Sequence, residues 1–103
     1  MKRFQSKQHL SYVRGLRCAI PTYGCQGRTE AHHLMRPWDG GRGMGMKALD
    51  TNVIPLCQLH HRELHKRGDE ISFFEEMGYN RDYGKALSRR LWESSPVQRD
   101  GVF

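Results

Sequence analysis

Cysteine and histidine residues crowd into the middle of this 103-residue chain. All three cysteines and five of the six histidines lie between positions 18 and 65: Cys18, Cys25, His32, His33, Cys57, His60, His61 and His65. Three cysteines cannot all pair within one chain, and the charged start MKRFQSKQHL is not followed by the apolar stretch of a secretory signal. A disulfide framework is therefore not expected. Cysteine and histidine together in a reducing compartment favour metal binding.

Length and composition limit the chain to one small domain. Its 103 residues are too few for two domains, and only 37% of them are hydrophobic. So thin a core is usually supported by a metal or by disulfides. No apolar run approaches the roughly 18 residues that span a membrane. A large multi-domain enzyme, an integral membrane protein and a Rossmann-type nucleotide binder are thereby excluded.

The chain is also basic. Lysine and arginine number 17 against 11 aspartates and glutamates, which gives a formal net charge of +6. This excess favours an anionic partner, of which nucleic acid is the commonest. A soluble basic surface without such a partner explains the charge equally well.

Hydrophobic spacing and turn residues predict an α+β fold. The expected elements are a helix over 6–14 capped by Ser6, a strand over 28–34, a strand over 51–54 ended by Pro55, a helix over 58–66 stopped by Gly68, a helix over 70–77 capped by Asp69, and a helix over 80–93 capped by Asn80. The two strands are joined by a wide glycine-rich loop over 36–47, which predicts an antiparallel hairpin. The tail, 94–103, is expected to be loose.

One set of candidate metal ligands combines thiols with an imidazole. Cys57 and His60 have C-x2-H spacing at the start of the helix over 58–66, and Cys18 and Cys25 have C-x6-C spacing at a turn containing proline and glycine. Three thiolates and one imidazole suit a closed tetrahedral zinc site. The alternative is that the three cysteines are buried free thiols that pack as small hydrophobes.

A second set consists of imidazoles alone. His61 and His65 are four residues apart, so they share one face of the helix at a spacing of about 6 Å. His32 and His33 end the first predicted strand. Adjacent residues project about 100° apart on a helix, so His60 and His61 are expected to serve different ions.

These residues, in this order, resemble the HNH nucleases of the ββα-metal (His-Me finger) superfamily. The pair His32-His33, then Asn52, then His61-x3-His65 is most similar to the nuclease domains of DNase colicins. The cysteine set resembles the zinc-bearing branch, which includes many small phage and prophage nucleases. That branch usually carries Cys-x2-Cys in both places, whereas this chain has C-x6-C and Cys57-x2-His60. The resemblance covers about 18–68, within one domain over 1–103 that has further helices over about 69–93.

The resemblance implies a role for each matched residue. His33 would be the general base, and Asn52 would fix the loop between the strands. Glu30 would orient a metal-binding histidine. The proposed ligands of the catalytic ion are His32, His61 and His65, and those of the structural zinc are Cys18, Cys25, Cys57 and His60.

The expected chemistry is hydrolysis of a phosphodiester bond in DNA. An unperturbed histidine is largely neutral at pH 7, so His33 can take a proton from water. Three imidazoles suit manganese, nickel, cobalt or zinc better than magnesium, and manganese is the first choice. Because adjacent residues of a regular strand point to opposite faces, His32 and His33 can serve one site only if the strand ends or bends there. Pro37 favours such an end.

Basic residues are expected to contact the phosphate backbone. The candidates are Arg28 in the first strand and Arg36, Arg42 and Lys47 in the glycine-rich loop. Phosphate contacts carry no sequence information, so weak sequence preference is expected. The alternative for the loop is an ordinary solvated segment.

Three hypotheses follow for the whole chain. The leading one is an HNH endonuclease that acts on DNA, without a membrane or small-molecule cofactor, in the cytoplasm and compatible with a prophage origin. The second is a zinc-stabilised nucleic-acid-binding module without catalysis. The third is a structural zinc protein that acts as an adaptor. Strand specificity, physiological metal and oligomeric state do not follow from the sequence.

Overall fold

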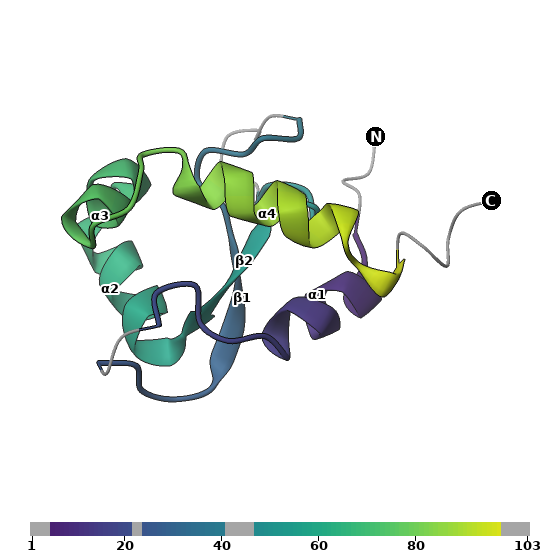
Figure 1. Cartoon of the computed structure of the whole chain (residues 1–103), viewed down its shortest axis with the longest axis horizontal. Coiled ribbons are helices and arrows are strands. Elements are labelled where there is room, and N and C mark those ends of the chain that lie inside the picture. Colours follow the sequence, from purple (N-terminus) through teal and green to yellow (C-terminus); the bar gives the residue numbers. More distant parts are fainter. Residues whose placement is uncertain (1–4, 22–23, 41–46, 98–103) are drawn as a thin grey trace.

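The fold is given by a computed structural model that describes residues 5–21, 24–40 and 47–97. Within these ranges the elements are α1 (Lys7–Arg14), β1 (Thr29–His33), β2 (Val53–Cys57), α2 (Gln58–Arg67), α3 (Glu70–Glu76) and α4 (Tyr83–Glu93). The strands form a two-stranded antiparallel sheet, which confirms the predicted α+β class and hairpin. In the view of Figure 1, helix α1 lies on one side of the two strands and α2 and α3 lie on the other, while α4 runs across them.

The second strand is displaced from its predicted position. It does not begin at Thr51, and the expectation that Pro55 ends it is wrong, because the strand runs through Pro55 to Cys57. In a two-stranded sheet every strand is an edge strand, where a residue without an N–H is tolerated. Pro55 pairs with Ala31, and its carbonyl oxygen accepts a hydrogen bond from the Ala19 N–H at 2.7 Å. All five residues of β2 are buried, since α1, α2 and α4 contact this strand.

Most of the predicted helix ends are confirmed. The Ser6 side chain accepts a hydrogen bond from the His9 N–H at the start of α1, and Asp69 accepts one from the Ile71 N–H at the start of α3. Gly68 ends α2 with a φ of 76°, a left-handed conformation that glycine adopts without steric cost.

Helix α4 begins later than predicted. Asn80 does not cap it; its side-chain oxygen accepts a hydrogen bond from the Asp82 N–H at 2.7 Å. This contact closes a turn, and the helix starts only at Tyr83. The asparagine therefore does what it often does before a helix, which is to form a local turn.

The core joins the sheet to the helices that cover it. Its largest fully buried side chains include Phe73 and Phe74 of α3. Gly84 of α4 permits close packing here, because a Cβ atom on it would lie 2.8 Å from Cε2 of Phe74.

The segment after α4 is more ordered than expected. Ser95 is fully buried, and its hydroxyl is 3.1 Å from Nδ1 of His9 in α1. The predicted loose tail therefore does not begin at Ser94. Its last residues, 98–103, lie outside the described residues.

Candidate metal centres

The structure brings the three cysteines and His60 together. The sulfur atoms of Cys18, Cys25 and Cys57 lie 3.6, 3.6 and 3.2 Å from Nδ1 of His60, and the four ligand atoms are all within 4.8 Å of one another. Typical Zn–S and Zn–N bond lengths in a tetrahedron place sulfur and nitrogen about 3.6 Å apart. The donor set and its spacing therefore fit a structural metal such as zinc.

Backbone groups surround the sulfur atoms of this Cys–His cluster. The N–H groups of Ile20 and Cys57 approach the sulfur of Cys18, and the N–H of His60 approaches the sulfur of Cys57. Burial raises the pKa of the Cys18 thiol to about 11. At Cys57 burial also favours the thiol, but hydrogen bonds from backbone N–H groups, that of His60 first, lower its pKa below the usual value. A metal ion bound here would hold all three cysteines as thiolates.

His32, His61 and His65 form a second cluster, which we call the imidazole cluster. Each offers a ring nitrogen, and these atoms lie within 4.8 Å of one another. The two Nε2 atoms on α2 are 3.2 Å apart. His32 is buried, His61 is partly buried and His65 is exposed, so the cluster reaches from the core to the surface. The structure places His60 in the Cys–His cluster and His61 in the imidazole cluster.

A buried carboxylate supports His32. Glu70, at the start of α3, accepts a hydrogen bond from Nε2 of His32 at 2.8 Å and from the N–H groups of Met35 and Arg36. The other ring nitrogen, Nδ1, is buried and has no hydrogen-bond partner within the described ranges. An unsatisfied buried nitrogen costs about 1–3 kcal/mol. Burial lowers the pKa of His32, which favours the neutral ring that a metal ligand must be.

A second carboxylate supports His61. Oε1 of Glu30 is 2.8 Å from Nδ1 of His61, and this hydrogen bond lowers the pKa of Glu30. The ring therefore presents Nε2 toward His65. Burial, followed by the nearby charge of His61, lowers the pKa of His65. Metal-binding histidines are commonly oriented in this way by a carboxylate on the other nitrogen.

His33 borders the same open hollow as the imidazole cluster. This hollow has a volume of about 510 Å³ and is lined by Ala31, His32, His33, Leu34, Met35, Lys47, Ala48, His61, His65 and Gly68. The strand ends at His33, as the proline after it predicted, which is how two adjacent histidines come to line one hollow. Nε2 of His33 lies 2.7 Å from Oδ1 of Asp50.

Asn52 fixes the loop between the strands. It is fully buried, and its side-chain oxygen accepts hydrogen bonds from the N–H groups of Trp38 and Asp39. Its side-chain NH₂ donates to the carbonyl oxygens of Asp39 and Leu49. Its own carbonyl accepts from Leu34. Both ends of the loop are thus tied to one residue.

The basic residues chosen from the sequence are spread around the molecule. Lys47 is exposed and lines the 510 Å³ hollow. Arg36 instead lines a small hollow of about 50 Å³ that Glu70 also borders. Arg28 is exposed and precedes β1 instead of lying in it as predicted, and Arg42 lies outside the described residues.

Comparison with known proteins gives a family for the chain. Residues 1–90 match the family described as "Protein of unknown function (DUF968)". The chain belongs to this family. It is also 35% identical over 79 residues to the Escherichia coli (strain K12) "Uncharacterized protein YdfU"; the match covers 75% of this chain and 20% of that protein. The chain thus spans only about a fifth of the length of this relative. No solved structure matches it.

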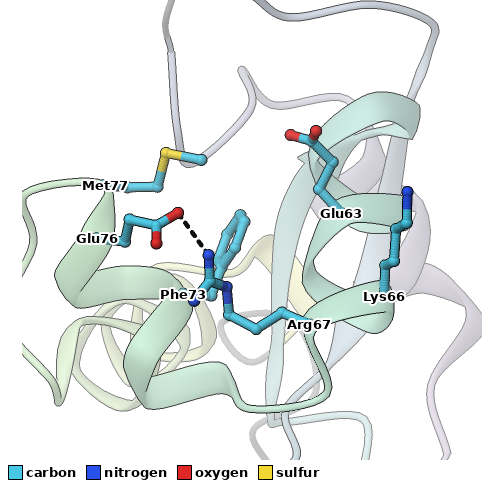
Figure 2. Close-up of a pocket in the computed structure, with 6 residues that line it drawn as sticks. All are labelled: Glu63, Lys66, Arg67, Phe73, Glu76 and Met77. Carbon is cyan, nitrogen blue, oxygen red and sulfur yellow. Dashed lines mark hydrogen bonds and ion pairs between the residues drawn. The ribbon is translucent and has the colours of Figure 1, made fainter.

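Another hollow, of about 280 Å³, lies between α2 and α3 of this DUF968 chain. Figure 2 shows the side chains that line it, among which Arg67 and Glu76 form a salt bridge. None of the residues that line it belongs to the Cys–His cluster or to the imidazole cluster.

No helix in the described ranges has the length and apolar character to span a membrane.

Two buried carboxylates at the site were missed by sequence analysis. Glu70 is hydrogen-bonded to His32 although the two are 38 positions apart in the sequence, and Asp50 is hydrogen-bonded to His33 across 17 positions. Each reads in the sequence as an ordinary residue, Glu70 in the first turn of a helix and Asp50 in a loop. The position of Asp50 two residues before Asn52 is the one signal that places it near the site.

Proposed function

We propose that the chain is a metal-dependent endonuclease of the HNH type that hydrolyses phosphodiester bonds in DNA. The observation that carries the proposal is the meeting of the imidazole cluster and His33 at one open hollow, separate from the Cys–His cluster. In this proposal β1, β2 and α2 form the ββα-metal core. The Cys–His cluster holds a structural zinc, which joins the segment before β1 to the start of α2.

The donor set fits a catalytic divalent ion. His32 has a buried nitrogen that lacks a hydrogen-bond partner in the described part of the chain, and both His32 and His61 have a carboxylate on their other nitrogen. A divalent ion on this cluster would withdraw electrons from a phosphate oxygen and stabilise the departing 3′ oxygen. Imidazole ligands favour manganese, nickel, cobalt or zinc over magnesium.

The other side chains at the hollow have separate roles in the proposed hydrolysis. His33 accepts the proton of the attacking water, a contribution worth roughly 10²–10⁴-fold in rate. Glu30 and Glu70 orient the metal-binding rings, and Asn52 holds the loop that carries Lys47. Lys47 contacts phosphate at the mouth of the hollow, which makes binding salt-dependent. Three cysteines that bind zinc instead of forming disulfides fit a reducing compartment, so this proposal places the protein inside the cell.

Digestion of supercoiled plasmid tests the proposal. We expect nicking with manganese, weaker nicking with magnesium and none with EDTA. We expect His33→Ala to lower the cleavage rate roughly 10²–10⁴-fold, while the melting temperature and the affinity for DNA stay unchanged. Glu75→Ala, an exposed change on α3, serves as the control and cleaves like the wild type.

Other outcomes of this experiment contradict specific parts of the proposal. Binding of DNA without cleavage in any of these metals would favour the non-catalytic binding module. Cleavage by His33→Ala at the wild-type rate would remove His33 as the base. A tenfold preference for magnesium over manganese would contradict the proposed metal ligands.

A further inference from the structure

Asp50 connects His33 to the start of α1. Its Oδ1 lies 2.7 Å from Nε2 of His33, and its Oδ2 accepts a hydrogen bond from the Ser6 N–H at 2.8 Å. Asp50 is only 3% exposed, and the His33 side chain is 15% exposed. The carboxylate is therefore held on one side by the backbone and directed at the imidazole on the other.

The geometry determines which nitrogen of His33 carries the proton. An ionised carboxylate only accepts hydrogen bonds, so Nε2 must donate to Asp50. In the neutral ring the lone pair is then on Nδ1. A water molecule can give its proton only to that nitrogen. The contact with Asp50 thus selects both the tautomer and the orientation of the ring.

We infer that Asp50 is a positioning residue for the hydrolysis, because it holds His33 as the Nε2–H tautomer with Nδ1 as the proton acceptor. This inference rests on the proposed function, in which His33 is the general base. His33 borders a second hollow of about 430 Å³, which Asp50, Lys7 and Lys47 also line. The His33 side chain therefore borders both hollows, and Asp50 borders the second of them.

Asp50→Asn tests the tautomer directly. The Ser6 N–H can be accepted only by the amide oxygen of the new asparagine, so its NH₂ group faces His33. A donor there requires a lone pair on Nε2 and moves the proton to Nδ1. Imidazole ¹⁵N chemical shifts of the zinc-loaded protein, assigned with His33→Ala, should report the Nε2–H form in the wild type and the Nδ1–H form in Asp50→Asn. The same tautomer in both proteins would overturn the inference, whatever the activity.

Cleavage kinetics give a second, independent test. We expect Asp50→Asn to lower kcat roughly 10²-fold, within the range of positioned acid–base catalysis, with little change in KM for DNA. Because Asp50 acts through His33, the same change should have no further effect in a His33→Ala background. Asp82→Asn is a suitable control, since Asp82 is exposed and its side chain makes no capping bond.

The two levels of the argument fail in different ways. If His33→Ala cleaves like the wild type, the proposed function fails. If His33→Ala is inactive but Asp50→Asn keeps the wild-type kcat, only the inference about Asp50 fails. A merely structural role would lower the melting temperature of Asp50→Asn and would leave the His33 tautomer unchanged, which would also overturn the inference.

Discussion

At the scale of the single residue, Glu70 combines two tasks. It accepts hydrogen bonds from His32 and from the N–H groups of Met35 and Arg36, just after β1. In Glu70→Gln one carboxylate oxygen becomes an NH₂ group, which cannot accept these hydrogen bonds. Loss of such an orienting partner typically lowers metal affinity 10–100-fold. We expect that decrease for manganese, measured by calorimetric titration.

A neighbouring glutamate provides the control for this prediction. Glu75→Gln changes the same chemical group at an exposed position of the same helix and should leave manganese affinity unchanged. The zinc content of the Cys–His cluster should stay the same in both variants. Equal manganese affinities for Glu70→Gln and the wild type would show that Glu70 does not orient a metal ligand.

Single residues also mark the limit of what the sequence predicts about the site. The ligand sets follow from short spacings such as His61-x3-His65, because the geometry of a helix fixes the distance between such residues. Glu70 and Asp50 depend on how α3 and the loop pack against the end of β1. That packing is a tertiary contact, to which no local pattern in the sequence corresponds.

At the scale of the element, the position of α4 depends on Gly84. A Cβ atom there would lie 2.8 Å from Phe74 and 3.0 Å from Leu34, both of which are buried. Alanine favours a helix over glycine by about 1 kcal/mol, but overpacking of a core costs about 1–3 kcal/mol. We therefore expect Gly84→Ala to lower the free energy of unfolding in a urea titration.

Gly15 offers the matched comparison. It ends α1 with a φ of −83°, and the nearest atom to an added Cβ lies 3.5 Å away. Gly15→Ala should therefore be neutral or stabilising. If Gly84→Ala stabilises the protein as well, then α4 does not pack against Phe74 as described.

The elements themselves were more predictable than their ends. Ser6, Gly68 and Asp69 mark helix ends in the sequence because each satisfies backbone groups locally. The end predicted at Pro55 is wrong, because a proline is tolerated within β2 when the sheet has two strands, as it does in the described part of the chain. The number of strands is a property of the whole fold.

At the scale of the whole molecule, the Cys–His cluster joins segments that are far apart in the sequence. Cys18 and Cys25 precede β1, while Cys57 and His60 lie at the junction of β2 and α2. A chain with so small a core should therefore depend on the metal for stability. We expect one tightly held zinc per chain, and removal by a strong chelator should lower the melting temperature by roughly 10 °C or more.

A variant of the other cluster separates the two centres. His65 is exposed, so His65→Ala should keep the tightly held zinc and melt at nearly the same temperature as the wild type. Cys57→Ser should lose the zinc and melt at a lower temperature. Zinc content is measured by elemental analysis after gel filtration. A protein that holds no zinc and melts at the same temperature with and without chelator would refute a structural metal.

His9 should make the stability of the fold depend on pH. It lies on α1 and is fully buried against the end of α4, with Ser95 on one ring nitrogen and the Trp92 ring 4.9 Å away. Burial lowers its pKa, although the negative charge of Asp50 partly opposes this. As pH falls below about 6.5, the unfolded chain binds a proton at this position before the folded chain does. The contribution of His9 to the free energy of unfolding is therefore fully present above that pH, and it is lost as the pH falls toward the lower pKa of His9 in the folded state.

This pH dependence can be separated from that of the other histidines with one variant. His9→Gln keeps polar atoms of similar reach but does not titrate. We expect urea unfolding midpoints of the wild type to fall more steeply between pH 7.5 and 5.5 than those of His9→Gln, whatever the offset between the two proteins at pH 7.5. Parallel curves would mean that His9 binds protons equally in the folded and unfolded states. The contact between α1 and the end of α4 would then contribute nothing to the acid sensitivity of the fold.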